Sequence, residues 1–104
     1  MNKLRIGNNE YELNSYYKSL HKDRPSWVFD IEASRDEIKP LIIDNQTFIV
    51  SSTIEGETSE RDLTDECILF GSMLENNDNT CVLTMESYSD VELLQQMIDD
   101  LLEV

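Results

Sequence analysis

The sequence predicts a single α+β domain over residues 1–104. Its antiparallel sheet is expected to have five or six strands built from hairpins, with one short central helix and a C-terminal amphipathic helix packed on the sheet. Three observations support this class. Short runs of alternating apolar and polar residues are separated by turn residues, two segments start with the Ser-x-x-Glu pattern of a helix N-terminus, and 104 residues suit one small domain.

The first elements are predicted from alternation and turn chemistry. Residues 3–7 and 11–13 alternate, and Asn8-Asn9 between them indicates a hairpin, because Asn tolerates positive φ. Residues 15–26 are polar and basic, so a loop or irregular edge is expected there. Residues 26–33 alternate cleanly and predict a strand.

The middle of the chain is predicted to hold a short helix, a strand and a loop. Ser34-Arg35-Asp36-Glu37 fits a capping box, and Pro40 limits the helix that it starts. Residues 47–50 read as a strand. Residues 53–64 contain many acidic and few apolar residues, which predicts an exposed acidic loop.

The C-terminal part is predicted to complete the sheet and to cover it. Residues 67–75 and 80–87 carry apolar side chains on both faces, which favours strands at the centre of a sheet. Ser89 and Glu92 form a second capping box, which starts a helix over about 90–103. Leu94, Ile98 and Leu101 of this helix are assigned to the core. The apolar residues that recur at helical spacing are Val91, Leu93, Leu94, Met97, Ile98, Leu101 and Leu102.

The two cysteines are predicted to be buried free thiols. If their strands pair through a turn at residues 76–79, Cys81 lies opposite Leu74 and Cys67 lies on the order of 23 Å further along the hairpin. A disulfide needs Cα atoms within about 7 Å, so pairing is not expected and a reducing compartment is indicated.

Residue patterns for catalysis, cofactors or metals are scarce. His21 is the only histidine, lies in a charged segment and is predicted to be solvent-exposed without a catalytic partner. Residues 75–79 lack the alternating ligands, glycine and distal glutamate of a calcium loop, and the three glycines form no phosphate loop. We therefore expect no catalytic residues, no metal site and no cofactor.

The charge is distributed asymmetrically along the chain. Residues 1–39 contain seven basic and seven acidic residues, whereas residues 40–104 contain fifteen acidic residues and Arg61, so the second part carries the whole net charge of −14. Such a field repels nucleic acids and anionic membranes and attracts basic surfaces. A basic-aromatic patch of Tyr16, Tyr17, Lys18, Lys22 and Arg24 would bind nucleic acid weakly against this field. The expected partner is a basic protein surface.

The acidic residues supply the candidate binding surface. Glu55 and Glu57, like Glu60 and Asp62, are two residues apart, which in extended backbone separates same-side carboxylates by roughly 6.6 Å, a spacing of the order of successive phosphates. Solubility is the alternative explanation of this charge. The predicted partner-binding residues are Glu55, Glu57, Glu60, Asp62, Asp65, Glu66, Glu75 and Asp78.

Several segments, taken in order, show the pattern of a known group of proteins: Leu4–Gly7, Tyr11–Leu13, Ser26–Phe29, Thr47–Val50, Leu69–Ser72 and Thr80–Thr84. They resemble short accessory proteins from siphophage and prophage tail modules. This resemblance implies a phage or mobile-element origin and a non-enzymatic role, and it assigns no functional residue.

Two functions are therefore expected. The first is an acidic interaction protein that mimics nucleic acid and inhibits a host defence or nucleic-acid-binding factor by occupying its basic surface. The alternative is a phage virion (tail) structural subunit whose acidity serves solubility. No apolar run approaches the roughly 18 residues of a membrane span and no signal-peptide core is present, which predicts the host cytoplasm, or the virion under the alternative. The oligomeric state stays open.

Overall fold

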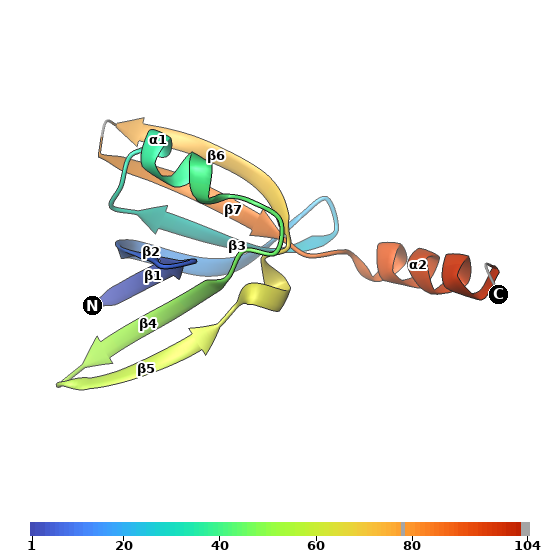
Figure 1. The fold of residues 1–104 in the computed structure, drawn as a ribbon, viewed down its shortest axis with the longest axis horizontal. Coiled ribbons are helices and arrows are strands. Elements are labelled where there is room, and N and C mark those ends of the chain that lie inside the picture. Colours follow the sequence, from blue (N-terminus) through green and yellow to red (C-terminus); the bar gives the residue numbers. More distant parts are fainter. Residues whose placement is uncertain (78, 103–104) are drawn as a thin grey trace.

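The computed structural model describes residues 1–77 and 79–102, which form an antiparallel sheet of seven strands (Figure 1). The strand order is β5-β4-β1-β2-β3-β7-β6. The α+β class with an antiparallel sheet is confirmed, with seven strands where five or six were expected. The strands are β1 (Asn2–Ile6), β2 (Asn9–His21), β3 (Arg24–Ile31), β4 (Phe48–Ile54), β5 (Glu57–Asp62), β6 (Leu69–Asn77) and β7 (Thr80–Glu86).

Helical segments are short except at the C-terminal end. Helix α1 (Arg35–Ile38) continues into the 3-10 helix η1 (Lys39–Leu41), and a second 3-10 helix, η2 (Thr64–Glu66), follows β5. The Ser34 hydroxyl accepts a hydrogen bond from the Glu37 amide at 3.3 Å, so the predicted cap of α1 is present. Helix α2 spans Asp90–Leu102.

The segment at residues 15–26 is a hairpin and not the expected loop. Strand β2 runs on to His21, and a turn at Lys22-Asp23, both with positive φ, leads directly into β3. A β-bulge between Leu13 and Ser15 shifts the alternation of the strand by one residue. This shift hides the strand pattern, because the apolar positions change phase in the middle of β2.

The expected acidic loop at residues 53–64 also forms a hairpin. Glu55 and Gly56 make its turn with φ of 51° and 82°. Strands β4 and β5 pair from Ile54 opposite Glu57 to Ile49 opposite Asp62. Turns with two positive φ values match the right-handed twist of the strands that they join. Because β5 is an edge strand with every residue exposed, it needs no apolar face.

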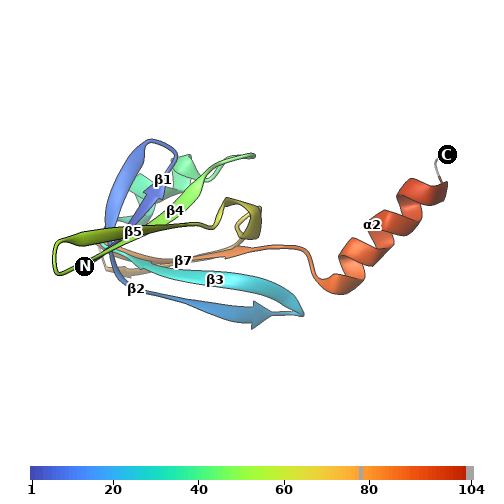
Figure 2. The ribbon, with the colours of Figure 1, turned by 90° about the horizontal axis from the view of Figure 1, so that it is seen from below.

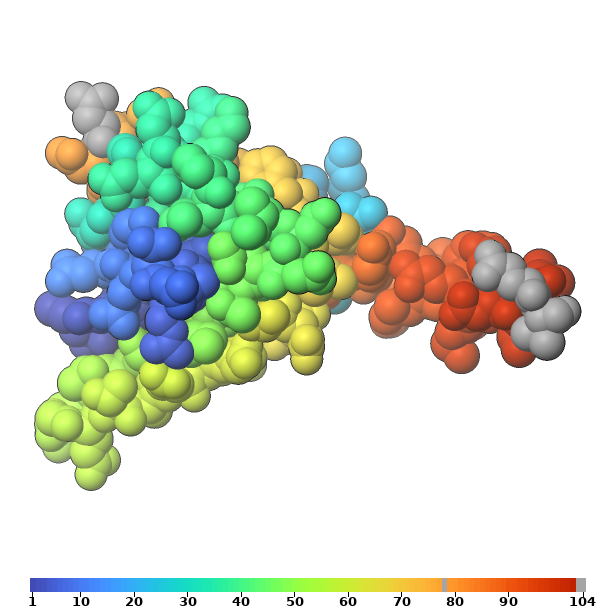
Figure 3. Space-filling view, in the orientation of Figure 1, coloured from blue at the N-terminus to red at the C-terminus, as the bar shows by residue number. Residues whose placement is uncertain are grey.

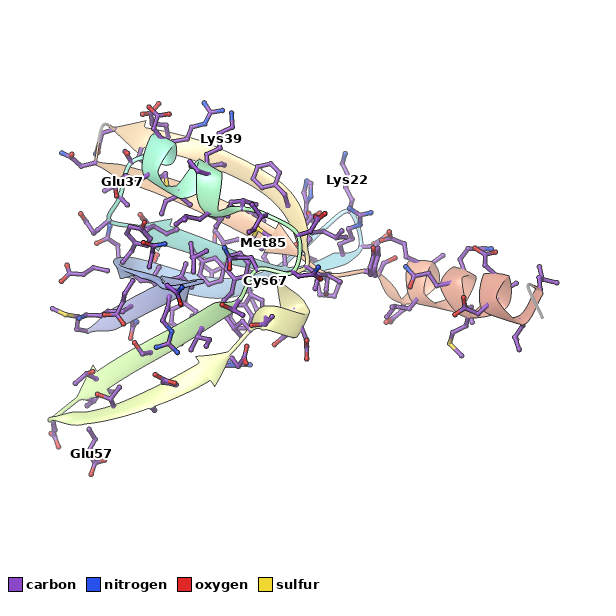
Figure 4. All side chains as sticks on the ribbon, viewed as in Figure 1. Lys22, Glu37, Lys39, Glu57, Cys67 and Met85 are labelled. Atoms are coloured by element: carbon purple, nitrogen blue, oxygen red, sulfur yellow. The ribbon has the colours of Figure 1, made fainter. Side chains whose placement is uncertain are left out.

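The hydrophobic core lies on one face of the sheet. Its fully buried side chains come from the middle strands, from α1 through Ile38 and from the segments that flank η2 through Leu63 and Cys67. Figure 4 shows Cys67 and Met85 in the centre of the body. The other face of the sheet carries exposed and partly exposed side chains, as is common in antiparallel sheets, except for the buried Ser26 and Glu86. The largest fully buried side chains are Phe29, Phe48, Leu4, Ile6, Ile31, Ile38, Leu63 and Leu83.

The predicted two-sided burial of the β6–β7 hairpin is wrong. Strand β6 is the second edge of the sheet, and Phe70 and Leu74 are exposed. The predicted pairing is off by one residue at Cys81, which lies opposite Glu75. Both cysteines are buried and free, as expected.

Helix α2 does not pack on the sheet, which corrects the assignment of its apolar residues to the core. It projects along the longest axis of the molecule, whose extents are 51 × 31 × 23 Å (Figures 1 and 2). All seven apolar residues of α2 are exposed, from 42% for Ile98 to 78% for Leu102. In the described part of the chain, no helix is long and apolar enough to span a membrane.

Candidate interaction surface

The β4–β5 hairpin holds four of the predicted acidic residues on the exposed edge of the sheet. Figure 3 shows the hairpin standing out from the body, and in Figure 4 the side chain of Glu57 points away from the tip. Glu55 occupies the turn, while Glu60 and Asp62 share one face of β5 because they are two residues apart. The predicted same-side spacing therefore applies to Glu60 and Asp62, whereas Glu57 lies on the opposite face.

Two of these carboxylates have partners within the chain. Glu60 forms an ion pair with Arg5 at 3.5 Å, between side chains that are both exposed. Asp62 accepts a hydrogen bond from the Thr64 amide at 2.9 Å, and the hydroxyl and amide of Thr64 lower the pKa of Asp62. Glu55 and Glu57 form no ion pair with any described residue. The carboxylates at the tip of the hairpin are therefore the ones most available to a partner.

The next acidic residues, in η2, have different surroundings. Asp65 is exposed, whereas Glu66 accepts hydrogen bonds from the Trp27 indole at 3.3 Å and from Lys18 at 3.5 Å. The Arg61 guanidinium lies 5.0 Å from the centroid of the Trp27 ring, within cation–π range. Trp27 therefore contacts both Glu66 and Arg61. Glu66 stabilises the fold by accepting the hydrogen bond of the buried indole, in addition to contributing negative charge to the surface.

The remaining predicted residues do not join this surface. Glu75 is exposed on β6, at the opposite edge of the seven-stranded sheet from β5. Asp78 lies outside the described residues. We define the acidic edge as Glu55, Glu57, Glu60, Asp62 and Asp65, which come from β5, its turn and η2.

A polar network that was not predicted from the sequence joins α2 to the sheet. Arg24 donates to both oxygens of Glu92 at 2.8 Å and to Glu86 at 3.3 Å. His21 is exposed as expected, but its Nδ1 lies 2.6 Å from Glu86, whose side chain is only 4% exposed. Ser89 and Glu92 also cap the helix reciprocally, each backbone amide donating to the other side chain at 3.2 Å. The one sequence signal for the network was this capping box, because the other contacts join residues far apart in the chain.

The bulge in β6 makes room for the buried carboxylate of this network. A Cβ atom at Gly71 would lie 2.9 Å from the Thr84 carbonyl oxygen and 3.0 Å from the Glu86 side chain. Gly71 is therefore required by the close approach of β7. A hollow of about 630 Å³ lies beside the network, lined by His21, Lys22, Arg24, Phe70, Gly71 and Glu92 among others.

The anchor of α2 is expected to weaken in acid. Hydrogen bonds from Arg24 and from the Ser89 amide lower the pKa of Glu92 to about 2, from an ordinary value of 4.5. The folded pKa is below the unfolded one, so the stabilisation is complete above pH 4.5 and is lost as the pH falls toward 2. Side-chain carboxyl NMR shifts should show Glu92 titrating near 2, while Asp90→Asn leaves this titration unchanged. A midpoint near 4.5 would contradict the network.

The two cysteine thiols are buried. Burial, with a smaller contribution from Glu66, raises the pKa of Cys67 to about 12, and burial also raises the pKa of Cys81. Both thiols stay protonated at neutral pH, so neither supplies a thiolate nucleophile. Among residues 1–77 and 79–102, no group of three or more His, Cys, Asp or Glu side chains is placed to hold a metal ion.

Comparisons with protein-family models, curated proteins and solved structures found no match.

Proposed function

We propose that the protein is a non-enzymatic binding protein, encoded by a phage or mobile element, that occupies a basic nucleic-acid-binding surface of a host protein in the cytoplasm. The observation that carries this proposal is the acidic edge. It is an exposed hairpin at the border of the sheet, and Glu55 and Glu57 at its tip are not neutralised by a described cation. An exposed negative surface attracts a complementary basic one and accelerates association.

The position of the acidic edge supports a binding role over a catalytic one. The carboxylates of Glu55, Glu57 and Asp65 are exposed, whereas a general acid or base works in a site that restricts water. The edge also suits a broad, shallow contact, because the hairpin stands out from the body (Figure 3). A nucleic-acid-binding surface is the kind of basic patch that such a row of charges fits.

Charge reversal at the acidic edge is expected to abolish partner binding without unfolding the protein. The variant Glu55→Lys, Glu57→Lys, Asp65→Lys changes three exposed residues that have no ion pair in the described chain, and such substitutions usually shift stability by under about 0.5 kcal/mol each. Immobilised protein should retain basic proteins from a bacterial lysate, and added duplex DNA should release them. The variant should retain none of these proteins.

The control carries the same charge change elsewhere. Glu75→Lys, Asp99→Lys, Asp100→Lys alters the opposite edge of the sheet and α2. This control should bind like the wild type, with weaker salt dependence at most. If both variants lost binding of the basic proteins equally, net charge alone would be responsible. If both variants bound them like the wild type, or if DNA did not release them, the proposal would be contradicted.

A phage tail structural subunit is the second candidate. The exposed apolar face of α2 favours it, because an assembling subunit needs apolar surface for its neighbours. In that case the charge-reversed variant would still support particle assembly, whereas deletion of the gene would prevent it.

A further inference from the structure

Helix α2 carries an apolar stripe that nothing in the described chain covers. Its Val91, Leu94, Ile98 and Leu101 recur at spacings of three and four residues, which is the a and d pattern of a coiled coil. In contrast to a core helix, α2 is joined to the body through Glu92 in its first turn, whose carboxylate accepts hydrogen bonds from Arg24. All four residues of the stripe are exposed, and Figure 2 shows α2 projecting away from the body.

We propose that α2 pairs with α2 of a second copy of this chain in a parallel two-stranded coiled coil. The residue types at the two seam positions support this partner. Val91 and Ile98 are β-branched and lie at a, whereas Leu94 and Leu101 lie at d. This combination favours parallel dimers over higher oligomers.

The placement of charge on α2 also fits a second copy. Glu92, Asp99 and Asp100 fall at positions b and c, away from the seam, and the helix contains no basic residue. At the flanking positions, Asp90 faces Gln95 of the second copy and Met97 faces Leu102 of the second copy. Two copies therefore meet without opposing their acidic residues, although the chain carries a net charge of −14.

A partner with a basic groove fits the stripe less well. In such a complex, acidic side chains should flank the apolar stripe so that they reach the rim of the groove. On α2 most of the acidic side chains lie on the opposite side of the helix from the stripe. This arrangement favours a second copy.

The length of the helix limits the strength of the dimer. Thirteen residues span about 20 Å, so the strip that two helices share is about 20 Å long and about 10 Å wide. Stable interfaces bury about 800 Å² on each partner, which is more than this strip offers. The dimer is therefore expected to dissociate in the micromolar range or above. An isolated helix of this length is also marginal in water, so pairing and helix formation should be coupled.

Sedimentation equilibrium of the whole chain from about 10 μM to about 1 mM tests this pairing. The wild type should shift from monomer to dimer, and its helical circular dichroism should rise with concentration. Ile98→Glu should remain monomeric, because it puts a charge in the seam. Gln96→Glu makes the same charge change at position f and should dimerise like the wild type. A wild type that stays monomeric to 1 mM, or an Ile98→Glu variant that dimerises equally, would overturn the proposal.

Disulfide cross-linking tests the parallel arrangement. Cys67 and Cys81 are buried, so an added surface cysteine reacts alone. In a parallel dimer Leu94 lies beside Leu94 of the second copy, so Leu94→Cys should form a disulfide-linked dimer at least tenfold faster than Gln96→Cys. Equal rates would refute the parallel seam.

The two proposals fail independently. The inference does not rest on the proposed function, because the charge-reversed residues Glu55, Glu57 and Asp65 lie outside α2. Thermal unfolding of Ile98→Glu should match that of the wild type, because α2 is not packed on the sheet. This measurement separates loss of pairing from loss of fold.

Discussion

Replacement of Phe29 by alanine is expected to lower the free energy of unfolding by about 3 to 5 kcal/mol. Phe29 is fully buried in β3, where it lies between Tyr16 of β2 and Leu83 of β7. The loss combines the transfer free energy of the ring with the cavity that it leaves. Urea unfolding monitored by circular dichroism gives the value. Because small domains are stable by about 5 to 15 kcal/mol, the variant should be close to unfolding at 37 °C.

Phe70→Ala is the matched control for this prediction. Phe70 lies in the edge strand β6 and its residue is 53% exposed, so the same substitution removes far less buried surface. Its expected cost is under about 1 kcal/mol. Equal losses for the two variants would contradict the exposure of Phe70 at the edge of the sheet.

Ile38→Ala is expected to destabilise the protein by about 2 to 5 kcal/mol and to release α1 from the sheet. Ile38 is fully buried and is the only buried residue of α1, so it is the main apolar anchor of this four-residue helix. Hydrogen exchange should then accelerate at the backbone amides of positions 38 and 42, which donate to the carbonyls of Ser34 and Lys39. The urea midpoint should fall in parallel.

Ile43→Ala removes the same atoms from an exposed position just after η1. This control should leave both the urea midpoint and the exchange of α1 unchanged. If Ile43→Ala were as costly as Ile38→Ala, the loop after η1 would have to be packed more closely than the structure shows.

Local signals in the sequence predicted local structure well. Ser34 caps α1, and the capping box of Ser89 and Glu92 starts α2. The first hairpin forms, but its turn is Gly7-Asn8 and not Asn8-Asn9, and the positive φ belongs to Gly7. These features depend on residues within about four positions of each other, so the sequence alone specifies them. Strand β2 was missed beyond Leu13 because its bulge breaks the alternation.

Features that depend on strand order could not be predicted. Strand β5 and Glu75 of β6 lie at opposite edges only because β1 pairs with β4 and β3 pairs with β7. The sequence therefore located the acidic residues of the hairpin but grouped them with Glu75. The contacts of Arg24 with Glu86 and Glu92 could not be predicted either, because they join residues that only the strand order brings together.

The misassigned helix shows a different limit of sequence patterns. A stripe of apolar residues at helical spacing is the same whether the helix covers a sheet or another helix. The sequence established that α2 is amphipathic, but the structure leaves Leu94 and Leu101 exposed. What the stripe packs against depends on the length and direction of the connection after β7, which no local pattern encodes.

The strand order also determines how the chain must fold. It divides the sheet into a meander, β1-β2-β3, and two hairpins, β4-β5 and β6-β7, each of which pairs neighbouring segments. Hairpins form in about 1 to 10 μs, but the sheet is complete only when β1 meets β4 and β3 meets β7, which are far apart along the chain. Bringing these distant strands together costs chain entropy before their contacts stabilise the sheet, so the two distant pairings set the folding rate. Helix α2 lies outside both closures, and the body can reach its native sheet before α2 has formed a single turn.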